Sequence, residues 1–165
     1  MFCVPPKEKK NKNKGFTLIE LLIVITIISI IVVVIFSLLN PLELFAHSRN
    51  AQRWVKVSEF LNAIHVYTVK HDGRVPNPST WQENVVYVLG TDNSGCDIAC
   101  GNKITTSTCL YLSDLIDDKK VPRMPVDPKG GTTGNTDFYI VRESGSVVTM
   151  GVCDPELGEV IELTR

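Results

Sequence analysis

The most prominent pattern in the chain is an uninterrupted apolar run near its N-terminus. From residue 16 to residue 39 the sequence has no Lys, Arg, Pro or Gly, and its only charged side chain is Glu20. As a helix, these 24 residues would extend roughly 36 Å, longer than the roughly 30 Å hydrocarbon core of a bilayer. The pattern therefore predicts a membrane-spanning helix over residues 16–39.

A second helix is predicted directly after this run. One face of the segment is apolar at alternating intervals of three and four residues: Trp54, Val57, Leu61, Ile64 and Thr68. Pro41 disfavours helical geometry at the residue before it, so a break is expected there. The sequence His-Asp-Gly at 71–73 is typical of a helix end. We expect an amphipathic helix over 41–72, with Trp54 anchored in a sheet rather than serving as a platform for a ligand.

The C-terminal part of the chain has the pattern of strands. Three segments of strand-forming residues, DFYIVRE, VVTMGV and EVIELT, are separated by the turns SGS and CDPELG. They predict a three-stranded antiparallel meander over 136–165. The stretch 73–135 between helix and sheet is rich in Pro, Gly, Asn, Ser and Thr, so it is expected to be a long loop with short elements near STWQENVVYVL and CLYLSDLIDD. The predicted class is α+β, with residues 40–165 forming one domain outside the membrane.

Charge sets the orientation of this arrangement. Five lysines and one glutamate give residues 1–15 a formal charge of +4, and the remaining residues carry −5 of the total of −1. The positive-inside rule then places the N-terminus in the cytoplasm and the body on the other side. The acidic body argues against nucleic acid as a partner.

Two common N-terminal segments fit this sequence poorly. A cleaved secretory signal has an apolar core of about 7–15 residues and a small-x-small cleavage site, whereas this run is longer and ends in LLNPLE. A plain signal anchor is the alternative, but an intramembrane carboxylate costs about 2.5–3.5 kcal/mol at the helix centre on insertion scales. Glu20 therefore indicates a role beyond anchoring.

The residues around Glu20 carry a family resemblance. The stretch KGFTLIELLIVI, residues 14–25, resembles the N-terminal signature of type IV prepilins and type II secretion pseudopilins: a basic leader followed by Gly, Phe, Thr, Leu, Ile and Glu. MPVDPKGG before DFYIV is similar to the loop that precedes the sheet in major pseudopilins. The resemblance implies a pilin-like fold, in which a long N-terminal helix, half membrane-spanning and half amphipathic, packs on a small antiparallel sheet.

The resemblance also implies a processing route. A prepilin peptidase would remove residues 1–15 by cleaving between Gly15 and Phe16, and would methylate the new amino group of Phe16. Glu20 would then meet the Phe16 ammonium group of a neighbouring subunit during assembly. Partners implied by the family are the peptidase, identical or related pilin subunits and an inner-membrane assembly platform. The protein would be a single-pass protein of the cytoplasmic membrane before it enters an extracellular or periplasmic filament.

The function that follows is that of a structural subunit of a type IV pilus-like filament. A pseudopilin that drives protein export by type II secretion is the alternative within the same machinery. A minor pilin acting as an adhesin or as a receptor in DNA uptake is an alternative from another class. The sequence has no G-x-S-x-G, H-E-x-x-H or phosphate-loop pattern, and His47, His65 and His71 lack catalytic partners at suitable spacing. We therefore expect no enzyme and no cofactor.

Four cysteines lie on the far side of the predicted span: Cys96, Cys100, Cys109 and Cys153. They can form two disulfides, with three possible connectivities, or a four-thiolate zinc site. Disulfides are favoured because the spacing lacks paired C-x₂-C motifs and because this compartment permits oxidation. Cys3 belongs to the leader and is expected to be incidental.

Two further groups of polar residues are candidate sites. Oxygen ligands near the sheet could hold calcium: Asp127, Asn135, Asp137 and Asp154. No regular ligand pattern accompanies them, so turn formation is the preferred interpretation and no metal is predicted. A basic cluster of Arg49, Arg53 and Lys56 can be a solvated face, a contact to lipid headgroups or an intersubunit pair, and the first two are favoured.

Overall fold

The computed structural model describes residues 15–144 and 147–165. The chain divides into two structural units, with the boundary between Pro41 and Leu42. The leader, including Cys3 and the lysines that set the predicted orientation, lies outside the described residues.

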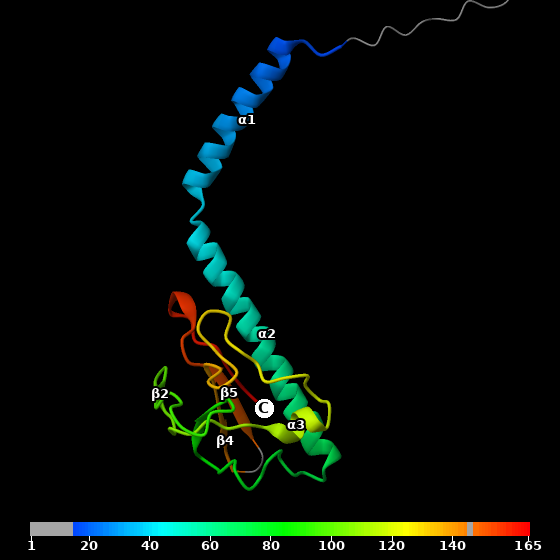
Figure 1. Ribbon diagram of the computed structural model, residues 1–165, viewed down its shortest axis with the longest axis vertical. Coiled ribbons are helices and arrows are strands. Elements are labelled where there is room, and N and C mark those ends of the chain that lie inside the picture. The colour runs from blue at the N-terminus through cyan, green and yellow to red at the C-terminus, as the bar shows by residue number, and fades with distance from the viewer. Residues whose placement is uncertain (1–14, 145–146) are drawn as a thin grey trace, which may run out of the picture. The chain divides into compact units, whose positions relative to one another are not determined.

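The first unit contains helix α1, Leu18–Leu38 (Figure 1). Its 21 residues are all exposed, and in the described part of the chain it is the one helix long and apolar enough to cross a membrane. The predicted helix over 16–39 is thus confirmed with slightly different ends. It begins later because Thr17 is extended and caps it, and it ends earlier because Leu39 is also extended.

Helix α2, Pro41–Lys70, belongs to the second unit apart from its first residue. The expected break before Pro41 is present, since residues 39–40 are not helical. At the other end, the chain turns at Gly73, whose φ of +83° is open to glycine at little cost. The backbone N–H of Gly73 donates to the carbonyl of Thr68 at 2.9 Å, which closes the helix. The helix therefore stops two residues before the predicted end at 72.

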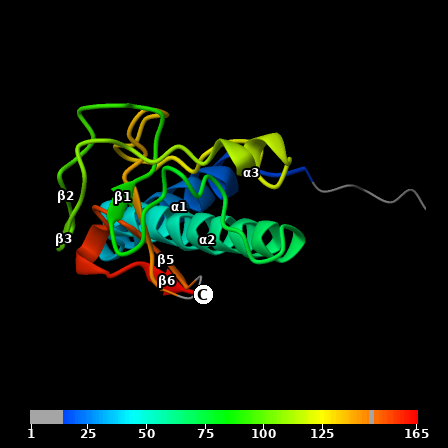
Figure 2. The same ribbon diagram turned by 90° about the horizontal axis from the view of Figure 1, so that it is seen from below.

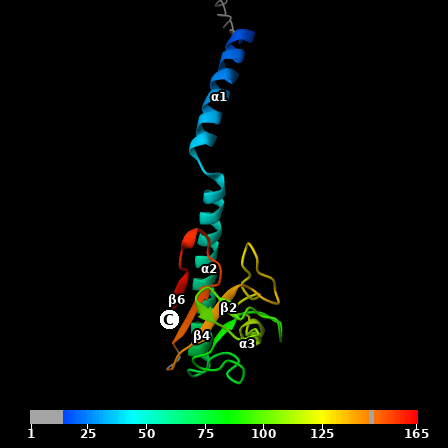
Figure 3. The ribbon, with the colours of Figure 1, turned by 90° about the vertical axis from the view of Figure 1, so that its left-hand side faces the viewer.

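The predicted meander is confirmed as three consecutive strands of the sheet. Strands β4 (Phe138–Arg142), β5 (Val148–Val152) and β6 (Glu162–Thr164) pair antiparallel in sequence order (Figure 3). A fourth strand, β1 (Val86–Val88), pairs with β4 and gives the order β1-β4-β5-β6. The sequence did not predict that this short element joins the sheet, because its partner β4 lies far away in the sequence.

The short elements predicted within the loop segment 73–135 are present: β1 lies in STWQENVVYVL, and a short helix α3 (Ser113–Asp117) lies in CLYLSDLIDD. A small hairpin of β2 (Ala99–Cys100) and β3 (Lys103–Ile104) was not predicted. Its two-residue strands carry too little periodicity to be recognised in a sequence rich in turn residues. A 3₁₀ turn, η1 (Glu156–Gly158), lies between β5 and β6.

Helix α2 lies along the sheet and contributes one face to the main core (Figure 2). Val57, Leu61 and Ile64 of the predicted stripe are buried, as expected. Trp54 is not: it is 39% exposed, so its predicted role as an anchor in the sheet was wrong. Arg53 takes the inward position beside it, and Trp81, from the segment between α2 and β1, is the fully buried tryptophan of the core.

Candidate functional site at the start of α1

The candidate site is the short segment that precedes α1. Gly15, Phe16 and Thr17 are not helical, and all three residues are exposed. The side chain of Phe16 is among the most exposed apolar groups of the described chain, at 80%. The peptide bond between Gly15 and Phe16 therefore lies in non-helical, accessible chain two residues before the first helical residue.

The start of α1 is fixed by a capping box between Thr17 and Glu20. Thr17 has extended φ and ψ of −83° and 153°, and its Oγ1 accepts a hydrogen bond from the N–H of Glu20 at 3.3 Å. In return, Glu20 Oε2 accepts from the Thr17 N–H at 2.8 Å and from its hydroxyl at 2.7 Å. The carboxylate also lies in the first turn, where the helix dipole favours negative charge.

This local role of Glu20 was not predicted from the sequence, where only its meeting with a second subunit was expected. The signal was present: Thr-Leu-Ile-Glu before an apolar run is the S/T-x-x-E capping-box pattern. Glu20 consequently has partners within its own chain, and these offset part of the cost of placing a carboxylate at the membrane face.

Beyond the capping box, α1 presents an apolar surface. Its three remaining hydroxyl groups are satisfied internally: Thr26, Ser29 and Ser37 donate to the carbonyls of Ile23, Ile25 and Val33 at 2.7–2.9 Å. Bonds of this kind hide the hydroxyl from the surroundings of the helix. The outer surface of α1 is therefore suited to lipid or to other apolar helices.

A family model described as the prokaryotic N-terminal methylation motif matches residues 10–38. The chain carries this methylation motif. Together with the apolar helix α1, the motif is consistent with a type IV pilin-like prepilin, and the resemblance read from the sequence is confirmed at this level. The match spans the Gly15–Phe16 bond, Glu20 and all of α1. No curated protein and no solved structure matches the chain.

The methylation motif is consistent with a structural, pilin-type protein. The α+β class predicted from the sequence is confirmed too, since an apolar N-terminal helix, a small antiparallel sheet and two disulfides fit a pilin-like fold. The motif and α1 indicate membrane anchoring, with an origin in the inner membrane.

In the second unit, the basic cluster of α2 is arranged differently from the prediction. Arg53 is fully buried and forms a two-point ion pair with Asp127, at 2.5 Å from Nε to Oδ2 and 2.9 Å from Nη2 to Oδ1. Its Nη1 also reaches Glu156 at 3.0 Å and Asn50 at 2.7 Å. The interpretation of Arg53 as a solvated or headgroup-contacting residue was therefore wrong. Its partners lie elsewhere in the same chain.

Several polar side chains surround Glu156. Arg49 donates twice to its carboxylate, at 2.6 and 2.7 Å, and Lys129 lies 3.2 Å from it. The side chain of Asn50 pairs with the backbone of Glu156, as donor to the carbonyl at 2.8 Å and acceptor from the N–H at 3.1 Å. We call Asn50, Arg53, Asp127 and Glu156 the Arg53 network. It joins α2 to the turn after β5 and to the loop before β4.

Both carboxyl groups of the network are held in the charged form. Burial would raise the pKa of Asp127, but hydrogen bonds from Arg53 and from the N–H groups of Lys129 and Gly130 outweigh burial, and the pKa is lowered. The pKa of Glu156 is lowered chiefly by the hydrogen bonds from Arg49. The Arg53 network is thus a set of ion pairs at neutral pH.

Of the other candidate calcium ligands, Asp137 has the most unusual environment. It adopts a left-handed φ of 62° in the turn before β4. Burial, followed by the charges of Asp97, Asp127 and Asp154, raises its pKa to about 6. Among the described residues, no group of three or more His, Cys, Asp or Glu side chains is placed to hold a metal ion.

The four outer cysteines form two disulfides in the structure, Cys96–Cys109 and Cys100–Cys153. This pairing selects one of the three connectivities that the sequence left open and leaves no thiolate among these four for zinc. The first bridge lies within residues 73–135, the segment predicted as a loop. The second bridge joins β2 to the residue after β5. Together with Val88 and Tyr139 the four cysteines form a second, smaller core.

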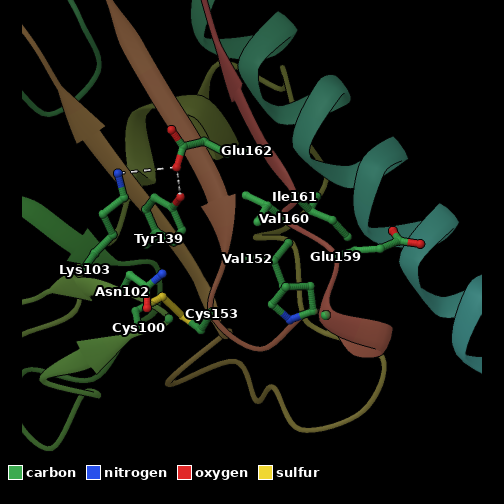
Figure 4. Close-up of a pocket in the computed structure, with 13 residues that line it drawn as sticks. Cys100, Asn102, Lys103, Tyr139, Val152, Cys153, Glu159, Val160, Ile161 and Glu162 are labelled. Atoms are coloured by element: carbon green, nitrogen blue, oxygen red, sulfur yellow. Dashed lines mark hydrogen bonds and ion pairs between the residues drawn. A yellow bond between two sulfur atoms is a disulfide. The ribbon is translucent and has the colours of Figure 1, made fainter.

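A cleft of about 290 Å³ lies between the β2–β3 turn and the segment that leads into β6 (Figure 4). The Cys100–Cys153 bridge lines it, and the Tyr139 hydroxyl donates to Glu162, which also lies 3.4 Å from Lys103 Nζ. Burial and the Glu162 carboxylate raise the pKa of Tyr139. Tyr139, Glu162 and Lys103 thus satisfy one another within the cleft.

Proposed function

We propose that this protein is a structural subunit of a type IV pilus-like filament. It is inserted as a prepilin, cleaved after Gly15, N-methylated at Phe16 and polymerised through its N-terminal helix. Its partners are a prepilin peptidase, other pilin subunits and an inner-membrane assembly platform. The subunit starts as a single-pass membrane protein with a cytoplasmic N-terminus and ends in a filament outside that membrane.

The observation that carries this proposal is the complete exposure of α1. All 21 residues of the helix are exposed, and Glu20 is its only charged residue. A contiguous apolar surface of this size requires either lipid or other protein around it. A helix that serves as a membrane anchor in the monomer and as a packing element in a filament meets this requirement in both states.

The position of Glu20 supports assembly in register. Cleavage after Gly15 creates an ammonium group on Phe16, one helical turn before Glu20. An unpaired charge in an apolar core is strongly penalised, whereas a paired one costs much less. A neighbouring subunit displaced along the filament axis brings its own Phe16 ammonium beside Glu20, and this pairing fixes the axial offset between subunits.

The capping box is compatible with this role. Glu20 binds Thr17 through one oxygen, Oε2, in all of its side-chain hydrogen bonds to that residue. A carboxylate has two oxygens with about four acceptor positions, so Oε1 remains able to accept from an ammonium group. Glu20 can cap its own helix and pair with a neighbour at the same time.

The test is the chemistry of the mature N-terminus. The full-length chain is expressed with an active prepilin peptidase and, as control, with a catalytically inactive one. Mass spectrometry should find an N-terminal, methylated Phe16 only with the active enzyme, and shearing should release filaments from those cells. An intact Met1 N-terminus beside the active enzyme would end the proposal. Correct processing without surface filaments, together with a loss of protein export in cells lacking the gene, would point to a pseudopilin.

A further inference from the structure

The capping box has a consequence for the peptide bond that precedes it. The first backbone bond of α1 runs from the Leu21 N–H to the Thr17 carbonyl, at 3.3 Å. Gly15 and Phe16 lie before this bond, outside the helix. A peptide bond inside a helix has its N–H and carbonyl engaged by the helix itself, whereas proteins that bind peptides by backbone pairing take them in extended form.

We propose that Thr17 is a positioning residue for prepilin cleavage, and this inference rests on the proposed function. As the N-cap, Thr17 makes the helix begin at Leu18 and so keeps the Gly15–Phe16 bond outside the helix and accessible to the peptidase. The hydroxyl of Thr17 and the carboxylate of Glu20 act together in this, because each satisfies a backbone N–H of the other residue.

Without the cap, nothing at residue 17 defines the end of the helix. Valine has nearly the shape of threonine but has no oxygen to accept from the Glu20 N–H, and it ranks among the poor N-cap residues. Phe16 is compatible with a helix, so the first turn can then shift toward the N-terminus and take in the bond to be cleaved. Gly15 opposes this shift, because glycine is a poor helix former. We therefore expect slower cleavage of the Thr17→Val variant rather than complete loss.

The second half of the capping box provides a matched control. Glutamine can replace glutamate at the third helical position of a capping box, because its side-chain oxygen also accepts from the N-cap N–H. Glu20→Gln should therefore be cleaved faster than Glu20→Ala, which removes the acceptor. This contrast separates the cap from the negative charge.

The experiment measures cleavage of the full-length chain by a purified prepilin peptidase in detergent micelles. We expect kcat/KM for Thr17→Val to fall about tenfold, which corresponds to about 1.4 kcal/mol. Thr17→Ser and Thr17→Asn should both be cleaved at near the wild-type rate, since both residues are strong N-caps of different shape. Hydrogen exchange should report a longer helix directly. The Ile19 amide lies in the first turn of α1 and should exchange more slowly in Thr17→Val, because a helix that begins earlier gives it the Gly15 carbonyl as acceptor.

Each outcome decides the matter. Cleavage of Thr17→Val at the wild-type rate would overturn the inference. It would also be overturned if Thr17→Asn were cleaved as slowly as Thr17→Val while Thr17→Ser kept the wild-type rate. That second result would indicate direct contact between the peptidase and the threonine side chain. If the wild-type chain itself is not cleaved, the proposed function fails and this inference fails with it.

Discussion

Arg53 on α2 and Asp127 in the loop before β4 form a buried two-point ion pair, with side chains 1% and 4% exposed. The pair connects the helix to a loop that is distant in the sequence, and Glu156 adds the turn after β5 to the same arginine. A buried pair of this kind contributes little net stability relative to apolar residues, yet removing one partner leaves a buried charge without compensation. The Arg53 network therefore fixes how the loops dock on α2.

The first prediction concerns this pair. Asp127→Ala should lower the free energy of unfolding by about 3–5 kcal/mol, because Arg53 is left buried with only part of its countercharge. Glu83→Ala, which removes a partially exposed partner 3.8 Å from Arg142, is the control and should cost less than about 1 kcal/mol. Denaturant unfolding of the detergent-solubilised chain measures both. Equal effects of the two substitutions would contradict the assigned role of Asp127.

The second prediction is a dependence of stability on pH through Asp137. Its folded pKa of about 6 lies above the ordinary value, so the folded state binds more protons than the unfolded state between about pH 4 and 6. The contribution of Asp137 to stability is present below the unfolded pKa and is lost as pH rises through 6. Asp137→Asn, which keeps a residue tolerant of left-handed φ, should stabilise the chain by about 1–3 kcal/mol at pH 7 and not at pH 4.

The measurement is a set of unfolding curves for wild type and Asp137→Asn from pH 4 to pH 8. The difference in the free energy of unfolding between the two proteins should grow as pH rises and level off above about pH 7. Asp154→Asn is a matched control on another carboxylate that acts on Asp137. It should lower the pKa of Asp137, and so stabilise the chain at pH 7 by less than Asp137→Asn does. A difference between wild type and Asp137→Asn that does not vary with pH would contradict the shifted pKa.

The third prediction concerns the two disulfides. By loop closure, Cys96–Cys109 and Cys100–Cys153, with sequence separations of 13 and 53, stabilise the fold by up to about 3 and 4 kcal/mol respectively. Replacing the second pair by alanine should cost more, since it also frees β2 and β3 from the end of β5. Peptide mapping without reductant should recover both linked pairs. Four free thiols with bound zinc, or a different pairing, would refute the connectivity.

The fourth prediction separates the two roles of Glu20. Glu20→Gln keeps the capping box but removes the charge that would meet the Phe16 ammonium of a neighbouring subunit, so cleavage should continue while polymerisation stops. Thr17→Val should do the reverse, slowing cleavage while the mature chains that do form still assemble. Counting sheared filaments and processed monomer in the membrane fraction tests both variants. Normal filament yield from the Gln variant would show that Glu20 does not set the register.

The N-terminal site could be predicted almost entirely from the sequence. The apolar run, Gly15, Phe16 and Glu20 are local features whose meaning depends on neighbours a few residues away, and the methylation motif lies within 10–38. Even the capping box was present in the sequence as Thr17 and Glu20 at the proper spacing, although it was not predicted. Cleavage and methylation at these residues stay predictions.

Other features were decided only by the tertiary structure. The sequence identified α2, its break before Pro41, the strands of the meander and the four cysteines, because periodicity and turn residues act over short distances. It did not determine that β1 joins β4 or which cysteines pair. Nor did it determine that Arg53 rather than Trp54 faces inward, because an arginine can be buried only where acidic partners exist, and here they come from residues 127 and 156. Local sequence determines the elements through backbone preference and periodicity, whereas contacts between distant segments depend on which partners folding brings together.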